Sequence, residues 1–283
     1  MELFNYSENC KEFSVFFLGD VHEGNANHNE IAFEKAVKRI KKASEDRKVI
    51  VITMGDMCDC INIHDPRFSP AEIDGKYAIK DLKDLPKKQF DYMFSKLAPI
   101  KDLIKYTIIG NHEESYVKWN GSDVYSYFNK ELLGLDSSAK LGYTAMGRIL
   151  LTNHKKTVTI KLALTHGTGG GGFREGYPLN NCLDIFKKYD CDVHVMGHTH
   201  KFVNTAYPFL SMNKVGDRQD RIKWYCCSGC FMDTYVEGNR NYFEGKKGMV
   251  SEIGFLEMFA RESKGWTYVM RKHQFINGDY IIT

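Results

Sequence analysis

Residues 191–200 read CDVHVMGHTH, and this stretch shows a pattern that recurs along the chain. Its alternating apolar residues predict a short strand, and Gly197 predicts a sharp turn where that strand ends. His198 and His200 then follow one residue apart. On an extended backbone, residues i and i+2 point to the same side, so we expect the two imidazoles to converge on one small volume. Imidazole is the commonest protein ligand of transition metals, so this stretch predicts part of a metal site.

Four earlier apolar runs show the same pattern, because each predicted strand ends in a cluster of polar residues. These strands are expected at residues 13–18, 48–54, 106–109 and 157–165. The clusters that follow them contain, in chain order, Asp20, His22, Asp56, Asn111, His112 and His166. In open α/β sheets, ligands gather beyond the carboxyl ends of strands, so we expect these side chains to share one edge of the fold.

The order of the expected elements predicts the fold class. A helix capped by Asn29 is expected after the first strand, with apolar residues at helical spacing from Glu30 to about Lys42. Strands and helices alternate in the first half of the chain. The second half is mostly strands and includes a hairpin over residues 143–165. This order predicts a layered α/β protein with mixed sheets.

The chain is expected to form a single domain over residues 1–283, because no linker separates two halves of different composition. Within this domain, residues 60–87 are polar and contain prolines, and they are too long for an ordinary connection between two elements. They predict an insertion near the site.

Composition excludes several classes of protein and leaves the substrate open. Of the 283 residues, 43% are hydrophobic and 27% are charged, which is typical of a globular protein. The net charge of +3 is too small to indicate nucleic acid by itself. The first ten residues include Glu2 and Glu8 and no apolar run, so we expect a cytoplasmic protein without a membrane partner. The eight cysteines lack the spacing of a secreted disulfide framework, so reduced thiols are expected.

Each polar group alone has a simpler explanation, because a lone histidine after a strand is more often structural and a Gly-Asp pair is usually a turn. Their recurrence after five successive strands indicates a shared site. Carboxylate, amide and imidazole ligands suit manganese, iron, zinc or nickel. Because the clusters contain no thiolate ligand, they argue against a Cys-rich structural zinc site. The set is larger than one ion requires, and two ions bridged by Asp56, about 3.5 to 4 Å apart, would use it fully. Such metal pairs hydrolyse phosphate esters.

The motifs D-x-H, G-D-x-x-D, G-N-H-E, H-G and G-H-x-H, in this order, resemble those of the calcineurin-like metallophosphoesterase superfamily. They extend from Asp20 to His200, about two-thirds of the chain. The resemblance is closer to the phosphodiesterase and repair-nuclease branch than to the phosphoprotein phosphatases. It implies a four-layer α-β-β-α sandwich of two mixed sheets with flanking helices, and a dinuclear metal site at the carboxyl ends of the strands.

The resemblance also implies roles for individual residues. The implied ligands of the first metal are Asp20, His22, Asp56 and His200. The implied ligands of the second metal are Asp56, Asn111, His166 and His198. His112 resembles the family's non-ligand histidine, which contacts the phosphate and can protonate the leaving oxygen. We therefore expect His112 and Asp56 to be catalytic, and two divalent ions, with manganese first among the four metals, to be the cofactors.

One departure from the family bears on the substrate. Phosphoserine phosphatases of the superfamily follow the second aspartate block with an arginine that grips the phosphate, and here Cys60 holds that place. We therefore expect a metal-dependent phosphoric ester hydrolase that cleaves phosphodiester bonds of nucleic acid or nucleotides by attack of a metal-bridging hydroxide. A phosphomonoesterase acting on protein or small molecules is the alternative, and a non-catalytic metal-stabilised scaffold is a third. The oligomeric state stays open.

Two segments are candidate walls for the substrate, although ordinary surface loops explain either of them equally well. Both contain basic and aromatic residues that could contact a phosphate or stack on a base. In the insertion these residues are His64, Arg67, Phe68 and Tyr77. In the other segment, the glycine run 169–172 precedes Phe173, Arg174 and Tyr177.

Overall fold

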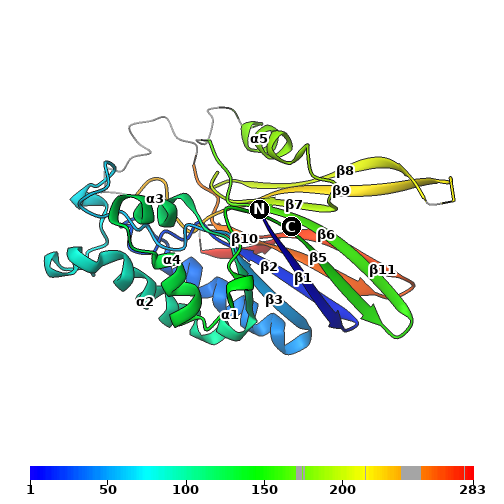
Figure 1. The fold of residues 1–283 in the computed structure, drawn as a ribbon, viewed down its shortest axis with the longest axis horizontal. Coiled ribbons are helices and arrows are strands. Elements are labelled where there is room, and N and C mark those ends of the chain that lie inside the picture. The colour runs from blue at the N-terminus through cyan, green and yellow to red at the C-terminus, as the bar shows by residue number, and fades with distance from the viewer. Residues whose placement is uncertain (170–173, 175, 214, 237–249, 277) are drawn as a thin grey trace.

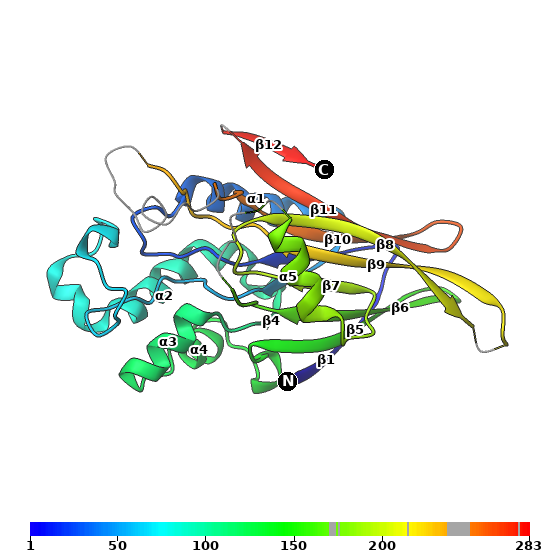
Figure 2. The same ribbon diagram turned by 90° about the horizontal axis from the view of Figure 1, so that it is seen from above.

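The structure is a computed structural model that describes residues 1–169, 174, 176–213, 215–236, 250–276 and 278–283. Two six-stranded mixed sheets pack face to face, and helices cover their outer faces (Figure 1, Figure 2). The expected α/β class, with two mixed sheets and flanking helices, is confirmed. Among the described residues, no helix has the length and apolar character needed to cross a membrane.

The first sheet, called the β1 sheet here, has the strand order β1-β5-β6-β7-β9-β8. Its strands are β1 Glu2–Asn9, β5 Thr144–Asn153, β6 Lys156–Thr165, β7 Val193–Met196, β8 Phe202–Met212 and β9 Arg218–Ser228. The expected hairpin is formed by β5 and β6, which pair antiparallel over their full lengths. β7 lies parallel to both of its neighbours, so its carboxyl end lies at the same edge as the carboxyl end of β6.

The second sheet, called the β2 sheet here, has the strand order β12-β11-β10-β2-β3-β4. Its strands are β2 Glu12–Leu18, β3 Lys48–Thr53, β4 Ile104–Thr107, β10 Gly254–Glu262, β11 Trp266–Ile276 and β12 Asp279–Ile282. β2, β3 and β4 are parallel, so their carboxyl ends lie at one edge of the sheet.

Strand β2 shows why its sequence is continuously apolar. Phe13, Val15 and Phe17 pack into the core between the two sheets. Phe16 and Leu18 point the other way, into the core beneath the helices. Both faces of the strand are therefore buried, and the usual alternation of apolar and polar residues disappears.

The part of the chain that the structure describes has the α-helices α1 Glu30–Asp46, α2 Leu85–Leu97, α3 Asn111–Asn120, α4 Val124–Ser126 and α5 Tyr177–Phe186. Asn29 caps α1 as expected, because its side-chain oxygen accepts the Ala32 N–H at 3.0 Å. Helix α5 lies over the β1 sheet, while α1 and α2 lie under the β2 sheet (Figure 1). The segment expected to be an insertion contains the short 3₁₀ helices Pro70–Glu72 and Ile79–Asp84, and its status as an insertion stays a prediction.

Three elements differ from the sequence expectation. Strands β1 and β12 were not expected from the sequence. Both lie at sheet edges and are largely exposed, so their sequences lack the apolar pattern that predicts a buried strand. The polar stretch from Asn111 was expected only as a cluster after a strand, but it begins α3, which buries only Glu113 and Tyr116 among its ten residues. A helix with so few buried positions lacks the apolar periodicity by which a sequence shows one.

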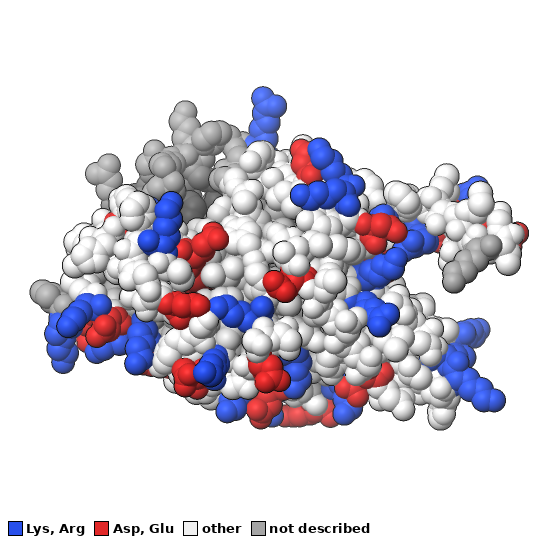
Figure 3. Space-filling model, in the orientation of Figure 1, with Lys and Arg blue, Asp and Glu red and all other residues white. Residues whose placement is uncertain are grey.

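Strands β8 and β9 extend past the body of the molecule as a two-stranded arm (Figure 1). Large apolar side chains are exposed on this arm, including Leu210 and Met212 at 68% and 71%. Elsewhere on the face shown in Figure 3, lysine and arginine side chains are interspersed with acidic ones. This mixture agrees with the small net charge of +3.

Candidate metal centre

Loops from both sheets meet beyond the carboxyl ends of five strands, and backbone contacts hold them together. The Asp20 N–H, after β2, donates to the Gly55 carbonyl oxygen, after β3, at 2.9 Å. The His198 N–H, after β7, donates to both carboxylate oxygens of Asp20 at 3.0 Å. The His166 imidazole, after β6, has its Nδ1 2.8 Å from the Met54 carbonyl oxygen. The polar side chains that the sequence predicted at one edge of the fold therefore come from both sheets.

The expected ligands form two groups of side chains. The ligand atoms of Asp20, His22 and His200 all lie within 4.8 Å of one another. Within this group, the Nε2 atoms of His22 and His200 are 3.1 Å apart. At most one of two facing imidazole nitrogens can donate a proton to the other, whereas a cation between them accepts both lone pairs.

The second group consists of Asp56, His166 and His198, whose ligand atoms also lie within 4.8 Å of one another. The side-chain oxygen of Asn111 joins it, at 3.0 Å from His166 Nε2 and 2.8 Å from His198 Nδ1. Because a carbonyl oxygen only accepts, the contact with Met54 places the proton of a neutral His166 on Nδ1. This leaves Nε2 as the ligand atom, the usual arrangement of histidines that bind metals.

Asp56 lies between the two groups. Its Oδ2 is 3.1 Å from His166 Nε2 and 3.8 Å from His22 Nε2. A carboxylate with one oxygen facing both groups has the position that a bridging ligand needs. The structure thus brings together all seven residues expected to bind metal, and their assignment as ligands remains a proposal.

The charges of the site favour cations. Burial by itself lowers the pKa of His166, but the Asp56 carboxylate outweighs burial and raises that pKa to about 10. Burial raises the pKa of Asp20 to about 7. Burial, together with the positive charge of His166, lowers the pKa of His198 to about 4. Buried carboxylates need a positive charge nearby that compensates their own. Divalent cations bound by these carboxylate and imidazole donors would supply it.

Five of the seven expected ligands adopt left-handed backbone conformations. The φ angles are 51° for Asp20, 52° for His22, 49° for Asp56, 68° for His198 and 54° for His200. The expectation that His198 and His200 lie on an extended backbone with parallel side chains is therefore wrong. Their imidazoles instead diverge, one into each group. Left-handed conformations cost about 1 to 3 kcal/mol at non-glycine residues and concentrate at functional sites.

His112 lies beside the two groups and contacts Asp59. Its Nδ1 is 2.6 Å from the Asp59 carbonyl oxygen, so Nδ1 carries the proton of the neutral ring. Its backbone N–H donates to Asp56 Oδ1 at 2.9 Å. The remaining ring atom, Nε2, is therefore the one that can exchange a proton with a bound molecule.

Two acidic residues within the sequence motifs, for which no role was expected, also shape the site. The Glu113 carboxylate accepts backbone N–H groups from Asp56 at 3.0 Å, from Met57 at 2.8 Å and from Gly110 at 3.0 Å. It therefore holds the loop after β3 against the loop after β4. The second, Asp59, has its Oδ1 3.4 Å from the Nδ1 atoms of both His22 and His112. Asp59 is the last residue of the G-D-x-x-D motif and Glu113 the last residue of G-N-H-E, so their places in these motifs could have indicated a role at the site.

Arg67 reaches the site from the segment expected to be an insertion. Its Nη1 lies 3.2 Å from His112 Nε2. Its Nε and Nη2 donate to the two carboxylate oxygens of Asp65, at 3.0 and 2.7 Å. Arg67 was among the residues of this segment expected to be able to contact a substrate, but its place beside His112 was not expected, because no spacing rule connects it with a histidine 45 residues away.

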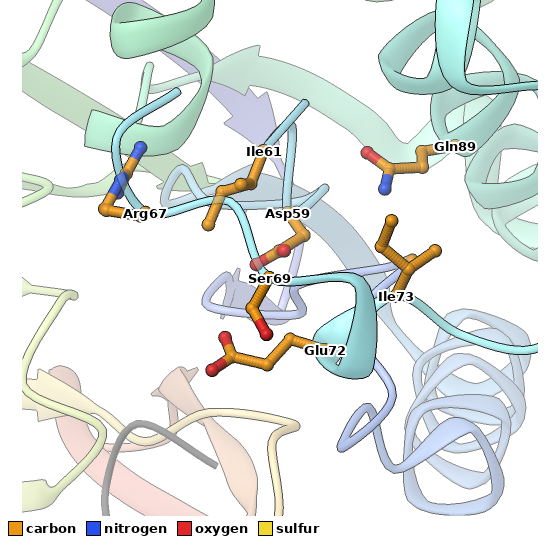
Figure 4. A pocket seen from close by; sticks show the side chains of 8 residues that line it. Asp59, Ile61, Arg67, Ser69, Glu72, Ile73 and Gln89 are labelled. Carbon is orange, nitrogen blue, oxygen red and sulfur yellow. The ribbon is translucent and has the colours of Figure 1, made fainter. Parts of the chain in front are cut away.

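A small pocket lies between this segment and the site. Asp59 lies near its centre, with Arg67 on one side and Gln89 on the other (Figure 4). Because Asp59 also faces His22 and His112, the pocket adjoins the metal centre. Of the second candidate substrate wall, Gly170–Gly172 and Phe173 lie outside the described residues, and Arg174 is exposed.

Known proteins provide independent comparisons. A family model described as calcineurin-like phosphoesterase matches residues 13–202. No curated protein matches the chain significantly. The structure resembles GAP50, the anchor in the inner membrane complex of Plasmodium, with 12% identity, a TM-score of 0.50, and coverage of 96% of this chain and 88% of that one.

Two further solved structures are similar at lower scores. Vps29 from Entamoeba histolytica, complexed with zinc, has 13% identity and a TM-score of 0.40, with 95% of this chain and 97% of that chain covered. A metallophosphoesterase from Sphaerobacter thermophilus has 10% identity and a TM-score of 0.36, with 92% and 88% covered. The family match spans all five motifs and every residue of the two ligand groups. The chain therefore belongs to the calcineurin-like phosphoesterase family, and it is a metal-dependent phosphoric ester hydrolase.

Proposed function

We propose that this phosphoesterase hydrolyses phosphodiester bonds of nucleic acid or nucleotides. Two divalent cations, with manganese as the first candidate, are its proposed cofactors. Asp20, His22, Asp56 and His200 would hold one cation, and Asp56, Asn111, His166 and His198 the other. Bound cations of this kind lower the pKa of water and neutralise charge on the phosphoryl group. The observation that supports this assignment is the position of Asp56 Oδ2, which faces both ligand groups.

The proposed role of His112 is to donate a proton to the leaving oxygen. The Asp59 carbonyl oxygen orients its ring by accepting from Nδ1, and Nε2 then faces Arg67. A general acid must lie within hydrogen-bond reach of the atom that it protonates, and Nε2 is the atom of His112 available for this.

The choice of a diester depends on the guanidinium at the site. A dianionic monoester is best held by an arginine whose two parallel N–H groups are available. Cys60 is buried at the position of the family's arginine. The Nε/Nη2 edge of Arg67 is already occupied by Asp65, whose carboxylate also compensates the positive charge of Arg67. These contacts favour a monoanionic diester as the substrate.

The test compares bis-p-nitrophenyl phosphate with p-nitrophenyl phosphate under manganese, with Asp56→Asn as the inactive control. We expect a higher kcat/KM for the diester. A screen over single-stranded DNA, duplex DNA, RNA and cyclic nucleotides then identifies the natural substrate class. A preference for the monoester would instead support the alternative, a phosphomonoesterase. Metal binding without turnover of any ester would support the scaffold.

A cytoplasmic location is part of the same proposal. All eight cysteines carry free thiols. Free thiols persist in reducing compartments, which supports the cytoplasm over an oxidising environment. Fractionation of the cells that produce the protein would test this location.

A further inference from the structure

The Asp65–Arg67 pair places a guanidinium at the metal centre in a restricted form. Arg67 uses Nε and Nη2 for the carboxylate of Asp65, at 3.0 and 2.7 Å, while Nη1 faces His112 Nε2 at 3.2 Å. A guanidinium has five N–H groups in a rigid planar arrangement, and its Nε/Nη2 edge is one of two edges that can bind a phosphate bidentately. The edge formed by Nε and Nη2 is therefore occupied, and Nη1, with the second N–H of Nη2, remains for a substrate.

Local contacts hold the pair in this arrangement. The side-chain oxygen Oδ1 of Asp65 also accepts the backbone N–H of Arg67 at 2.9 Å, and Asp65 is only 6% exposed. Asn62 Nδ2 donates to Asn120 Oδ1 at 2.9 Å, which ties this segment to α3, the helix that carries His112. The position of Arg67 relative to His112 is thus set by contacts on both sides.

The charge of the pair matters as much as its geometry. Asp65 compensates the positive charge of Arg67, so the two side chains together add no net charge to the site. A dianionic terminal phosphate gains most from an uncompensated, bidentate guanidinium, whereas a diester carries one negative charge and needs one donor. Removing the charge of Asp65 would therefore favour the dianion over the monoanion.

We propose that Asp65 selects phosphodiesters against phosphomonoesters by compensating the charge of Arg67 and occupying its Nε/Nη2 edge. This makes Asp65 and Arg67 specificity-determining residues for the activity proposed above, on which the inference rests. Asp65 acts through Arg67 and is a positioning residue, while Nη1 of Arg67 binds a phosphoryl oxygen.

The decisive variant is Asp65→Asn, which keeps an oxygen acceptor and removes the charge. The ratio of kcat/KM for p-nitrophenyl phosphate to that for bis-p-nitrophenyl phosphate should rise by about tenfold or more, since charged hydrogen bonds contribute about 1.5 to 3 kcal/mol. Inorganic phosphate should bind the manganese-loaded variant more tightly by a similar factor in isothermal titration calorimetry. The double variant Asp65→Asn, Arg67→Gln should lose both gains.

Asp74→Asn is the matched control. Asp74 accepts the backbone N–H of Lys76 at 2.9 Å and pairs with its Nζ at 3.0 Å, so it repeats the same aspartate–cation motif in the same segment away from His112. In the Asp74→Asn variant, the ratio of kcat/KM for the monoester to that for the diester should equal the wild-type ratio. An unchanged ratio in a folded, manganese-binding Asp65→Asn protein, or an equal rise in Asp74→Asn, would overturn the inference.

Arg67→Gln provides a second measurement that does not depend on the fold of the Asp65 variant. It should raise KM for the diester about fivefold or more at retained kcat, because Nη1 is lost; an unchanged KM would contradict the role of Arg67. The two proposals fail separately in these experiments. A wild type that prefers the monoester refutes the proposed diesterase, whereas the inference about Asp65 depends only on the change of the ratio between variants.

Discussion

At the scale of single residues, Asp56 is held from three sides. Its backbone N–H donates to Glu113 Oε2 at 3.0 Å, its Oδ1 accepts the His112 N–H at 2.9 Å, and its Oδ2 lies 3.1 Å from His166 Nε2. These contacts direct Oδ2 toward both ligand groups. Gly110 completes the arrangement, because its lack of a side chain lets the loop after β4 lie directly against Asp56.

Replacing Gly110 by alanine should therefore weaken metal binding. A Cβ at this position would overlap Asp56 Oδ1 and the Asp56 amide nitrogen, so the carboxylate must move. Mn²⁺ affinity measured by calorimetry should fall by about 10- to 100-fold, as is typical when groups that orient metal ligands are lost. Gly142→Ala is the control, since no heavy atom lies within 4 Å of its added Cβ. Equal affinities for the two variants would contradict the argument.

His112→Asn should separate catalysis from metal binding. Loss of a general acid typically lowers kcat by about 10² to 10⁴, while the ligand groups lose no proposed member. We expect stoichiometric Mn²⁺ binding with kcat reduced by that range. His154→Asn, in the turn between β5 and β6, should keep the wild-type kcat. Full turnover by the His112 variant would remove its proposed role.

At the scale of elements, a buried ionic network joins α1 to the β2 sheet far from the metal centre. Glu257 of β10 accepts from Ser14 Oγ and from Arg47 Nη2, each at 2.5 Å, and lies 2.9 Å from His273 Nε2. Arg47 caps the carboxyl end of α1. The network therefore connects β2, β10 and β11 to the helix that covers them.

This network predicts a dependence of stability on pH. Burial by itself raises the pKa of Glu257, but hydrogen bonds from His273 and Ser14 and the charge of Arg47 outweigh it and lower that pKa to about 2. The stabilisation is fully present above the ordinary pKa of 4.5 and is lost as the pH falls toward 2. It amounts to something on the order of 3 kcal/mol.

Urea unfolding of the wild type and Glu257→Gln measures this contribution. The difference between their free energies of unfolding should be large at pH 5.5 and should shrink as the pH falls to 3. For Glu2→Gln, a substitution at an exposed position of β1, the difference from the wild type in free energy of unfolding should not change between these pH values. A difference that stays constant with pH would exclude Glu257 as its source.

At the scale of the whole molecule, the metal centre joins the two sheets. Asp20, Asp56 and Asn111 follow strands of the β2 sheet, whereas His166, His198 and His200 follow strands of the β1 sheet. Cations bound by both sets would therefore connect two layers that otherwise meet through their apolar core. Their binding should stabilise the folded protein as a whole.

Metal removal should consequently lower the melting temperature. By mass action, a cation at 100 times its Kd stabilises the native state by about 2.7 kcal/mol. Calorimetry should show a lower Tm after treatment with EDTA and its recovery on addition of Mn²⁺. Asp56→Asn should lose most of this response, and Asp184→Asn, on the exposed face of α5, should retain it. A Tm that ignores the metal would argue against a cation between the sheets.

Much of the fold follows from local patterns in the sequence. The apolar run at Phe13–Leu18, the Asn29 cap and the hairpin around His154 each depend on neighbouring residues, so the sequence predicts them directly. Strands β1 and β12 and helix α3 were missed, since exposed edges and sparsely buried helices leave no periodic signal.

The sequence alone determined the chemistry of the centre, because strands that end in Asp, Asn and His residues specify the donor types and the edge at which they gather. Only the tertiary structure decided which of those side chains belongs to which of the two ligand groups. The left-handed backbone at His198 and His200 sends their imidazoles into different groups, and Arg67 meets His112 across 45 residues of sequence. Contacts between distant segments set both features, and spacing along a chain carries no information about such contacts.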